Sequence, residues 1–246
     1  MVQTINFSSM AFRDVKVTPF LPENHSAVER FRQSFNAGEI KKRLVDSFDV
    51  RALGEQEIYT EDIGDGIQYQ ITFGEGILVF HLIDKTGDIL ANFICEPSGN
   101  RIKFTHREVV TNLKEETGIS GSDYLKKAED FLRIFLDVVE AGMDKEKRKK
   151  FFEIEAGQIK VIEWADKNHY HIEDAKQKKL LDQIKAGVSH IITDEFARGN
   201  LFKGYIIKTK EDYDRLVGLR KSGMDESEFR REVIRCSERF KMVKDI

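Results

Sequence analysis

Four turn signals divide residues 57–105 into segments that all have the length of a β-strand. The signals are Gly64-Asp65-Gly66, Gly74-Glu75-Gly76, Lys85-Thr86-Gly87-Asp88 and Pro97-Ser98-Gly99-Asn100. Glycine, asparagine and aspartate tolerate the positive φ of tight turns, and proline favours turns by fixing its own φ. Turn signals at this spacing predict an antiparallel meander of about five strands.

The apolar pattern of these segments predicts which strands lie at the edges. Ile67–Phe73 alternates apolar residues with glutamine and threonine, and Arg101–Thr105 alternates in the same way, as strands with one wet face do. Ile77–Ile83 and Ile89–Cys95 are apolar on both faces, which predicts central strands covered on both sides. Glu57–Ile63 supplies the fifth strand.

The residues before this meander predict its cover. Two short strands are expected at 5–7 and 15–17, followed by a helix from Pro22 to about Gly38. A second helix carries Ile40, Leu44, Val45 and Phe48 at helical spacing, and the two helices are expected to cover one face of the sheet.

The period of the apolar residues changes to 3.6 after residue 118. A short helix through Val109 and Leu113 is expected to stop at Gly118, and a long one, capped by Ser120 or Ser122, to end at Gly142. Residues 151–164 fit either a helix or a hairpin, and we prefer the helix. Further helices are expected at 180–188, at 210–221 with Thr209 as cap, and at 229–240, with a lone strand at 205–207.

These patterns together predict an α+β fold. Residues 1–118 form an N-terminal antiparallel β-meander covered by helices, and residues 119–246 form a mainly helical half that packs either with the first half or as a second domain. The first region holds 13 basic and 18 acidic residues, whereas the second holds 27 and 25. The division therefore also separates an acidic half from a nearly neutral one.

Composition places the chain among soluble cytoplasmic proteins. The 246 residues carry a formal net charge of -3, and no apolar run is long enough to cross a membrane. The first twelve residues lack the features of a signal peptide. Only two cysteines occur, Cys95 and Cys236, and both lie in apolar patterns, which predicts small buried residues rather than a disulfide.

Motifs of nucleophilic and nucleotide chemistry are absent from the sequence. There is no G-x-S-x-G, no G-x-x-x-x-G-K-[ST], and no G-x-G-x-x-G between a strand and a helix. The glycine pairs of residues 64–66 and 74–76 each join two strands around an acidic residue, which would repel phosphate. We therefore expect no cofactor, and the sequence leaves open whether the protein is an enzyme.

Basic clusters give a candidate nucleic-acid surface. Such clusters neutralise phosphates, although acidic neighbours on the same helix face would instead pair with the arginines. The candidate residues are Lys145, Lys147, Arg148, Lys149 and Lys150, together with Arg231 and Arg235 of the expected last helix.

A short polar segment gives a weaker metal candidate. His169 and His171, with Glu173 and Asp174, could chelate a transition metal in an extended chain. The alternative is a polar loop between helices whose carboxylates cap the next helix. The metal reading would make the protein a metal-dependent hydrolase.

A loop at residues 194–204 is the candidate surface for a protein partner. It mixes charges of both signs with aromatic residues and joins a helix to the lone strand, and the candidate contacts are Phe196, Arg198, Phe202 and Lys203. Since no catalytic constellation is complete, our leading expectation is a non-catalytic intracellular binding or regulatory protein with a protein partner or self-association. Nucleic-acid binding and metal-dependent hydrolysis are the alternatives, and no membrane partner is expected.

Overall fold

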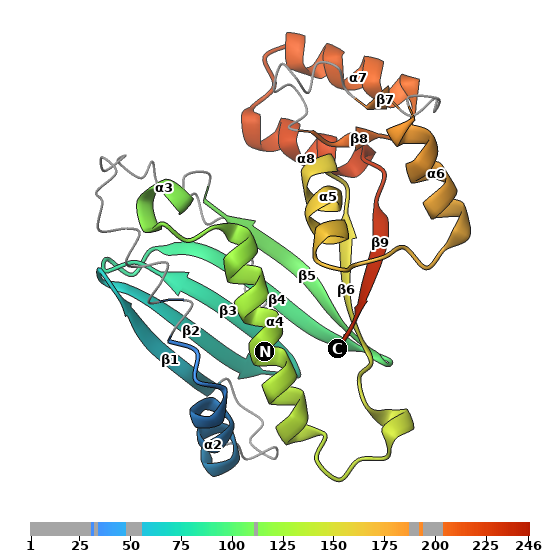
Figure 1. Ribbon diagram of the computed structural model, residues 1–246. Coiled ribbons are helices and arrows are strands. Elements are labelled where there is room, and N and C mark those ends of the chain that lie inside the picture. The colour runs from blue at the N-terminus through green and yellow to red at the C-terminus, as the bar shows by residue number, and fades with distance from the viewer. Residues whose placement is uncertain (1–30, 32–33, 48–55, 111–112, 187–191, 194–203) are drawn as a thin grey trace, which may run out of the picture.

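The computed structural model describes residues 31, 34–47, 56–110, 113–186, 192–193 and 204–246. Within them the chain forms a mixed α/β fold around a mostly antiparallel seven-stranded sheet (Figure 1). In spatial order its strands are β1 (Gln56–Gly64), β2 (Ile67–Gly74), β3 (Ile77–Ile83), β4 (Ile89–Ser98), β5 (Arg101–Val109), β6 (Phe151–Ala156) and β9 (Phe240–Asp245).

The first five strands form the expected antiparallel meander, because its turns are specified locally. Asp65 and Gly66 have φ of 57° and 74°, and Glu75 and Gly76 have φ of 50° and 79°. Two successive left-handed residues match the twist of a two-residue hairpin. The prediction of this meander is confirmed.

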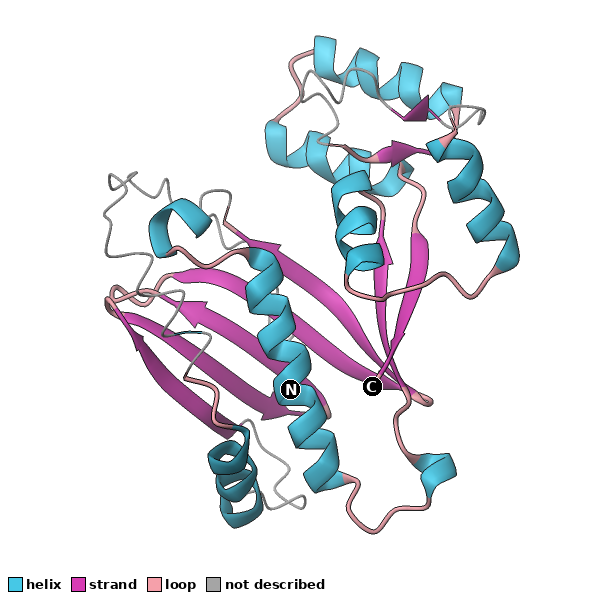
Figure 2. Ribbon diagram, viewed as in Figure 1, coloured by secondary structure: helices cyan, strands magenta, loops and turns pink. Residues whose placement is uncertain are grey.

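Seven helices accompany the sheet in the described residues (Figure 2). The long helix α4 starts where predicted, since the Ser120 side chain accepts a hydrogen bond from the Asp123 amide, and Thr209 caps α7 in the same way. The helices are α2 (Ala37–Ser47), α3 (Leu113–Thr117), α4 (Gly121–Val139), α5 (Ile159–Lys167), α6 (Ala175–Lys185), α7 (Lys210–Lys221) and α8 (Glu226–Cys236).

Three sequence predictions about helices were wrong. Residues 151–164 form strand β6 followed by α5, because Phe152, Ile154 and Ala156 alternate toward the core with period 2. The last helix ends at Cys236, and Phe240 lies in strand β9. The short helix expected from Val109 begins only at Leu113, since Val109 still belongs to β5.

The edges and cover of the sheet also differ from expectation. β5 is not an edge strand, because β6 pairs with it in parallel and β9 pairs with β6. On β3, Leu78, Phe80 and Leu82 are buried while the residues between them are half-buried, so the two faces are not equally covered. The buried face is the one that packs against α4 through aromatic rings, Phe80 and Phe131 lying 5.7 Å apart between centroids.

Two hydrophobic clusters are present in the described residues. The larger one combines the sheet with α2, α4 and residues as far along the chain as Leu181 and Ile184, so it includes residues on both sides of position 118. The smaller one lies between α7, α8 and strand β8 (Ile206–Ile207), which pairs with β7 (Ile192–Thr193). Cys95 and Cys236 are both buried and free, one in each cluster. No helix in the described ranges has the length and apolar character that crossing a membrane requires.

Candidate functional site

The parallel strands β5 and β6 separate before they end. Their pairing begins at Arg101 with Phe151 and stops at Phe104 with Ile154, although β5 continues to Val109 and β6 to Ala156. Figure 1 shows the two strands spreading apart toward their carboxyl ends. In open sheets, ligands bind at the carboxyl ends of parallel strands where neighbouring connections diverge. We call this part of the molecule the β5–β6 opening.

An irregularity in the neighbouring ladder lies at the level of this separation. Ile94 pairs with His106 and Cys95 pairs with Phe104, so Thr105 is an additional residue on β5. A β-bulge of this kind bends the strand and increases its twist. The bulge therefore accounts for the departure of β5 from β6 directly after Phe104.

Arg107 occupies the β5–β6 opening. It pairs with Phe93 of β4, and its guanidinium crosses to β6, where it donates a hydrogen bond to the carbonyl of Glu155. Arg107 is half-buried, and burial lowers the pKa of its guanidinium. Within the described residues it forms no salt bridge, because the Glu155 carboxylate pairs instead with Arg239, 3.7 Å away. A buried cation without a carboxylate partner is costly unless something else compensates it.

The first turn of α4 lies beside Arg107. Tyr124 stacks on Phe93, the cross-strand neighbour of Arg107, with 4.6 Å between ring centroids. A Cβ on Gly121 would lie 3.5 Å from the Val109 side chain, an ordinary contact distance, so the start of α4 lies next to the end of β5. The amides of Gly121 and Ser122 open the helix and therefore have no acceptor within it.

A buried polar network connects α4 with β9 and with the segment after α5. Glu129 of α4, only 1% exposed, accepts hydrogen bonds from the Tyr170 hydroxyl at 2.5 Å and from Lys244 of β9 at 2.6 Å. Burial, and secondarily the Glu129 carboxylate, raises the pKa of Tyr170. Tyr170 also interacts electrostatically with Arg107, which links this network to the β5–β6 opening.

The basic residues predicted to bind nucleic acid do not come together. Lys145, Lys147 and Lys150 are exposed after α4, whereas Arg148 donates to the Met143 carbonyl and Lys149 to the Gly99 carbonyl. The arginines of α8 lie at the opposite end of the molecule (Figure 1). Nucleic-acid binding stays a prediction, but it would have to use one of the two clusters.

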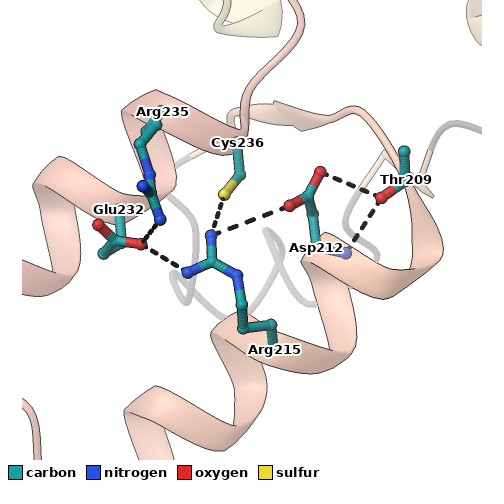
Figure 3. Close-up of polar contacts among 6 residues, drawn as sticks. All are labelled: Thr209, Asp212, Arg215, Glu232, Arg235 and Cys236. Carbon is teal, nitrogen blue, oxygen red and sulfur yellow. Dashed lines mark hydrogen bonds and ion pairs between the residues drawn. The ribbon is translucent and has the colours of Figure 1, made fainter.

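The arginines of α8 belong to a charged network with α7. Glu232 accepts from Arg215 at 2.7 Å and from Arg235 at 2.6 Å, and Arg215 also contacts the Cys236 sulfur at 2.7 Å (Figure 3). Burial raises the pKa of the Cys236 thiol. Arg231 lies 4.0 Å from Glu228. These arginines therefore have acidic partners on the two helices.

The predicted metal residues have other contacts. Asp174 caps α6, Glu173 pairs with Arg101 at 2.5 Å, and the backbone of His171 pairs with Val243 of β9. His169 has a positive φ of 68° at the end of α5. No group of three or more possible metal ligands occurs in the described part of the chain. The predicted partner-binding residues Phe196, Arg198, Phe202 and Lys203 lie outside the described residues.

Sequence reasoning missed Arg107. Its strand was expected to end near Thr105, and its parallel partner β6 comes about fifty residues later, so nothing local marks the separation of the two strands. The available signal was the apolar pair Val109-Val110 after a charged stretch, which extends the strand beyond Arg107.

Comparison with known proteins gives little further guidance. No protein-family model matches the chain, and no curated protein matches it. Among solved structures, the chain is similar to a nourseothricin acetyltransferase, with a TM-score of 0.33 and 10% sequence identity over 79% of this chain and 89% of that one. A likeness this low carries no argument about what the protein does.

Proposed function

We propose that this protein is a non-catalytic binding and regulatory protein that holds an extended, acidic segment of a protein partner in the β5–β6 opening. The observation that carries the proposal is Arg107, a half-buried guanidinium without a salt bridge in the described residues, placed where two parallel strands separate. A carboxylate would supply the missing countercharge.

The backbone around Arg107 suits an extended ligand. Beyond Phe104 and Ile154 the backbones of β5 and β6 no longer pair with each other, and the Glu155 carbonyl of β6 accepts from Arg107. A peptide added beside such an edge gains main-chain hydrogen bonds, while side-chain contacts supply specificity. Arg107 is the contact that would select an acidic residue.

A carboxylate fits this place better than a polyphosphate does. Glu115 of α3 is exposed just before α4, and Asp123 lies in the first turn of α4. These carboxylates oppose the multiple negative charges of a phosphorylated ligand, although the amides of Gly121 and Ser122 would attract a single one. The free cysteines in both clusters suit a reducing cytoplasm, where such a partner would be met.

Phage display tests the proposal without knowledge of the partner. Random twelve-residue peptides are panned on the full chain and, in parallel, on Arg107→Gln and on Arg101→Gln. Arg101 lies on the same strand but already pairs with Glu153 and Glu173, so it is the matched control. We expect the wild type and Arg101→Gln to enrich peptides with aspartate or glutamate.

Synthetic peptides from that selection then give the affinity. We expect Arg107→Gln to bind them about tenfold to a hundredfold more weakly, which is the loss of one hydrogen bond between charged groups. Selection of the same peptides by Arg107→Gln, or no acidic enrichment, would overturn the proposal.

A further inference from the structure

A groove between α7 and α8 lies away from the β5–β6 opening. It has a volume of about 440 Å³, and Leu219 and Met224 supply its apolar lining. Both residues are half-buried and pack against the smaller hydrophobic cluster. Four charged residues complete the groove: Arg215, Glu228, Arg231 and Glu232.

The charged side chains of the groove differ in their contacts and in their exposure. Arg215 is fixed by Glu232 at 2.7 Å and by the Cys236 sulfur (Figure 3). Arg231 and Glu228, in contrast, are 70% and 60% exposed and lie 4.0 Å apart. An exposed pair at that distance contributes little to stability, so both side chains can exchange partners at small cost.

The charge balance indicates what kind of surface the groove fits. Residues 210–236 carry seven basic and seven acidic residues, and the groove itself has two arginines and two glutamates. The groove therefore has no net positive charge that would attract a nucleic acid or a strongly acidic protein. A surface that also carries both arginine and glutamate side chains would be complementary in charge to this groove. The same groove on a second copy of the chain is such a surface.

We propose that the chain self-associates through this groove as a two-fold dimer. In a two-fold contact, residue i of one copy meets residue j of the other and the reverse contact forms as well. Arg231 of each copy then pairs with Glu228 of the second copy, and the apolar linings at Leu219 and Met224 become covered. The dimer leaves the β5–β6 opening untouched, so it stands independently of the proposed function.

Charge reversal tests this contact directly. Sedimentation velocity over roughly 5–200 µM protein compares the wild type with Arg231→Glu, Glu228→Arg and the variant carrying both changes. We expect a reversible dimer in the wild type, at least tenfold weaker association in each single variant because like charges meet, and recovery in the double variant. Circular dichroism checks that all four proteins are folded.

A matched pair elsewhere on the molecule supplies the control. Lys147 and Asp144 have the same spacing of three residues and similar exposures of 70% and 69%, but lie after α4. Lys147→Glu is expected to dimerise like the wild type. A chain that is monomeric at the highest concentration overturns the proposal, and so does a dimer that survives both single reversals or one that the double variant does not restore.

Discussion

The two ends of the β5–β6 pair differ in whether their charged side chains have partners of opposite charge. At the paired end, Glu153 is only 4% exposed and accepts from Arg101 at 2.8 Å, with Lys103 at 3.4 Å. At the open end, Arg107 has a backbone carbonyl as its partner. The same two strands therefore carry one cluster of compensated charge and one cation that lacks compensation in the described residues.

The charged groups at one end therefore stabilise the fold, whereas the charge at the other end is available to a ligand. The ion pairs at the paired end, called the closed end below, hold β5 and β6 together where their backbones also pair. Arg107 lies where the backbones no longer pair, and its half-buried charge has no salt bridge in the part of the chain that the structure describes. Lys127 of α4 is an intermediate case, because it is buried against oxygen atoms and has a carboxylate only at 3.5 Å.

Removing the carboxylate at the closed end should have the largest effect. Glu153→Gln is expected to lower the free energy of unfolding by about 3 kcal/mol, the lower end for breaking a buried ion pair, because Arg101 and Lys103 are partly exposed. Urea denaturation measures it. Glu173→Gln removes an exposed partner of the same arginine and should cost less than about 1 kcal/mol. Equal losses of unfolding free energy in the two variants would mean that the burial of Glu153 does not strengthen its ion pairs.

The pH dependence of stability should reveal the intermediate case, Lys127. Its ammonium donates to the Phe31 carbonyl and the Ser34 hydroxyl at 2.8 Å each, and burial lowers its pKa from 10.5 to about 8. The folded state therefore binds fewer protons than the unfolded state between pH 8 and 10.5, and stability rises with pH through that window. The expected gain between pH 7 and 9.5 is about 2 kcal/mol.

The Lys127→Met variant isolates this contribution. Its stability is measured by urea denaturation beside the wild type across the same pH range, and the difference between the two slopes is compared. Burial raises the pKa of both cysteine thiols, which lowers stability at high pH in either protein and cancels in the difference. Parallel pH profiles for the two proteins would show that Lys127 titrates normally.

Sequence reasoning succeeded where structure depends on neighbours in the chain. The hairpins around Asp65 and Glu75 are encoded by two or three residues, and the caps at Ser120 and Thr209 act within one helical turn. The buried cysteines followed from their apolar surroundings. Each of these features needs no knowledge of a distant segment.

Sequence reasoning failed where pairing is distant. Strand β6 follows β5 in the chain only after α4, and β9 follows β6 after about eighty further residues. Residues 151–156 and Phe240 were therefore assigned to expected helices. Glu153 interrupts the apolar pattern of β6, yet it is buried because Arg101 and Lys103 of β5 compensate it. The β5–β6 opening depends on the same distant pairing, and its importance was therefore invisible in the sequence.

Neutralising the open end should have the smallest effect on stability. Arg107→Gln keeps a donor group beside the Glu155 carbonyl but removes a half-buried charge that has no salt bridge within the described residues. We expect the free energy of unfolding to change by less than about 1 kcal/mol in urea, in either direction. A loss above about 2 kcal/mol would show that Arg107 contributes to stability as Arg101 does.

The melting temperature tests whether the open end binds a ligand. A selected acidic peptide should raise the melting temperature of the wild type, since binding stabilises the folded state. It should leave Arg107→Gln unchanged, because that variant no longer presents a charge for the peptide to compensate.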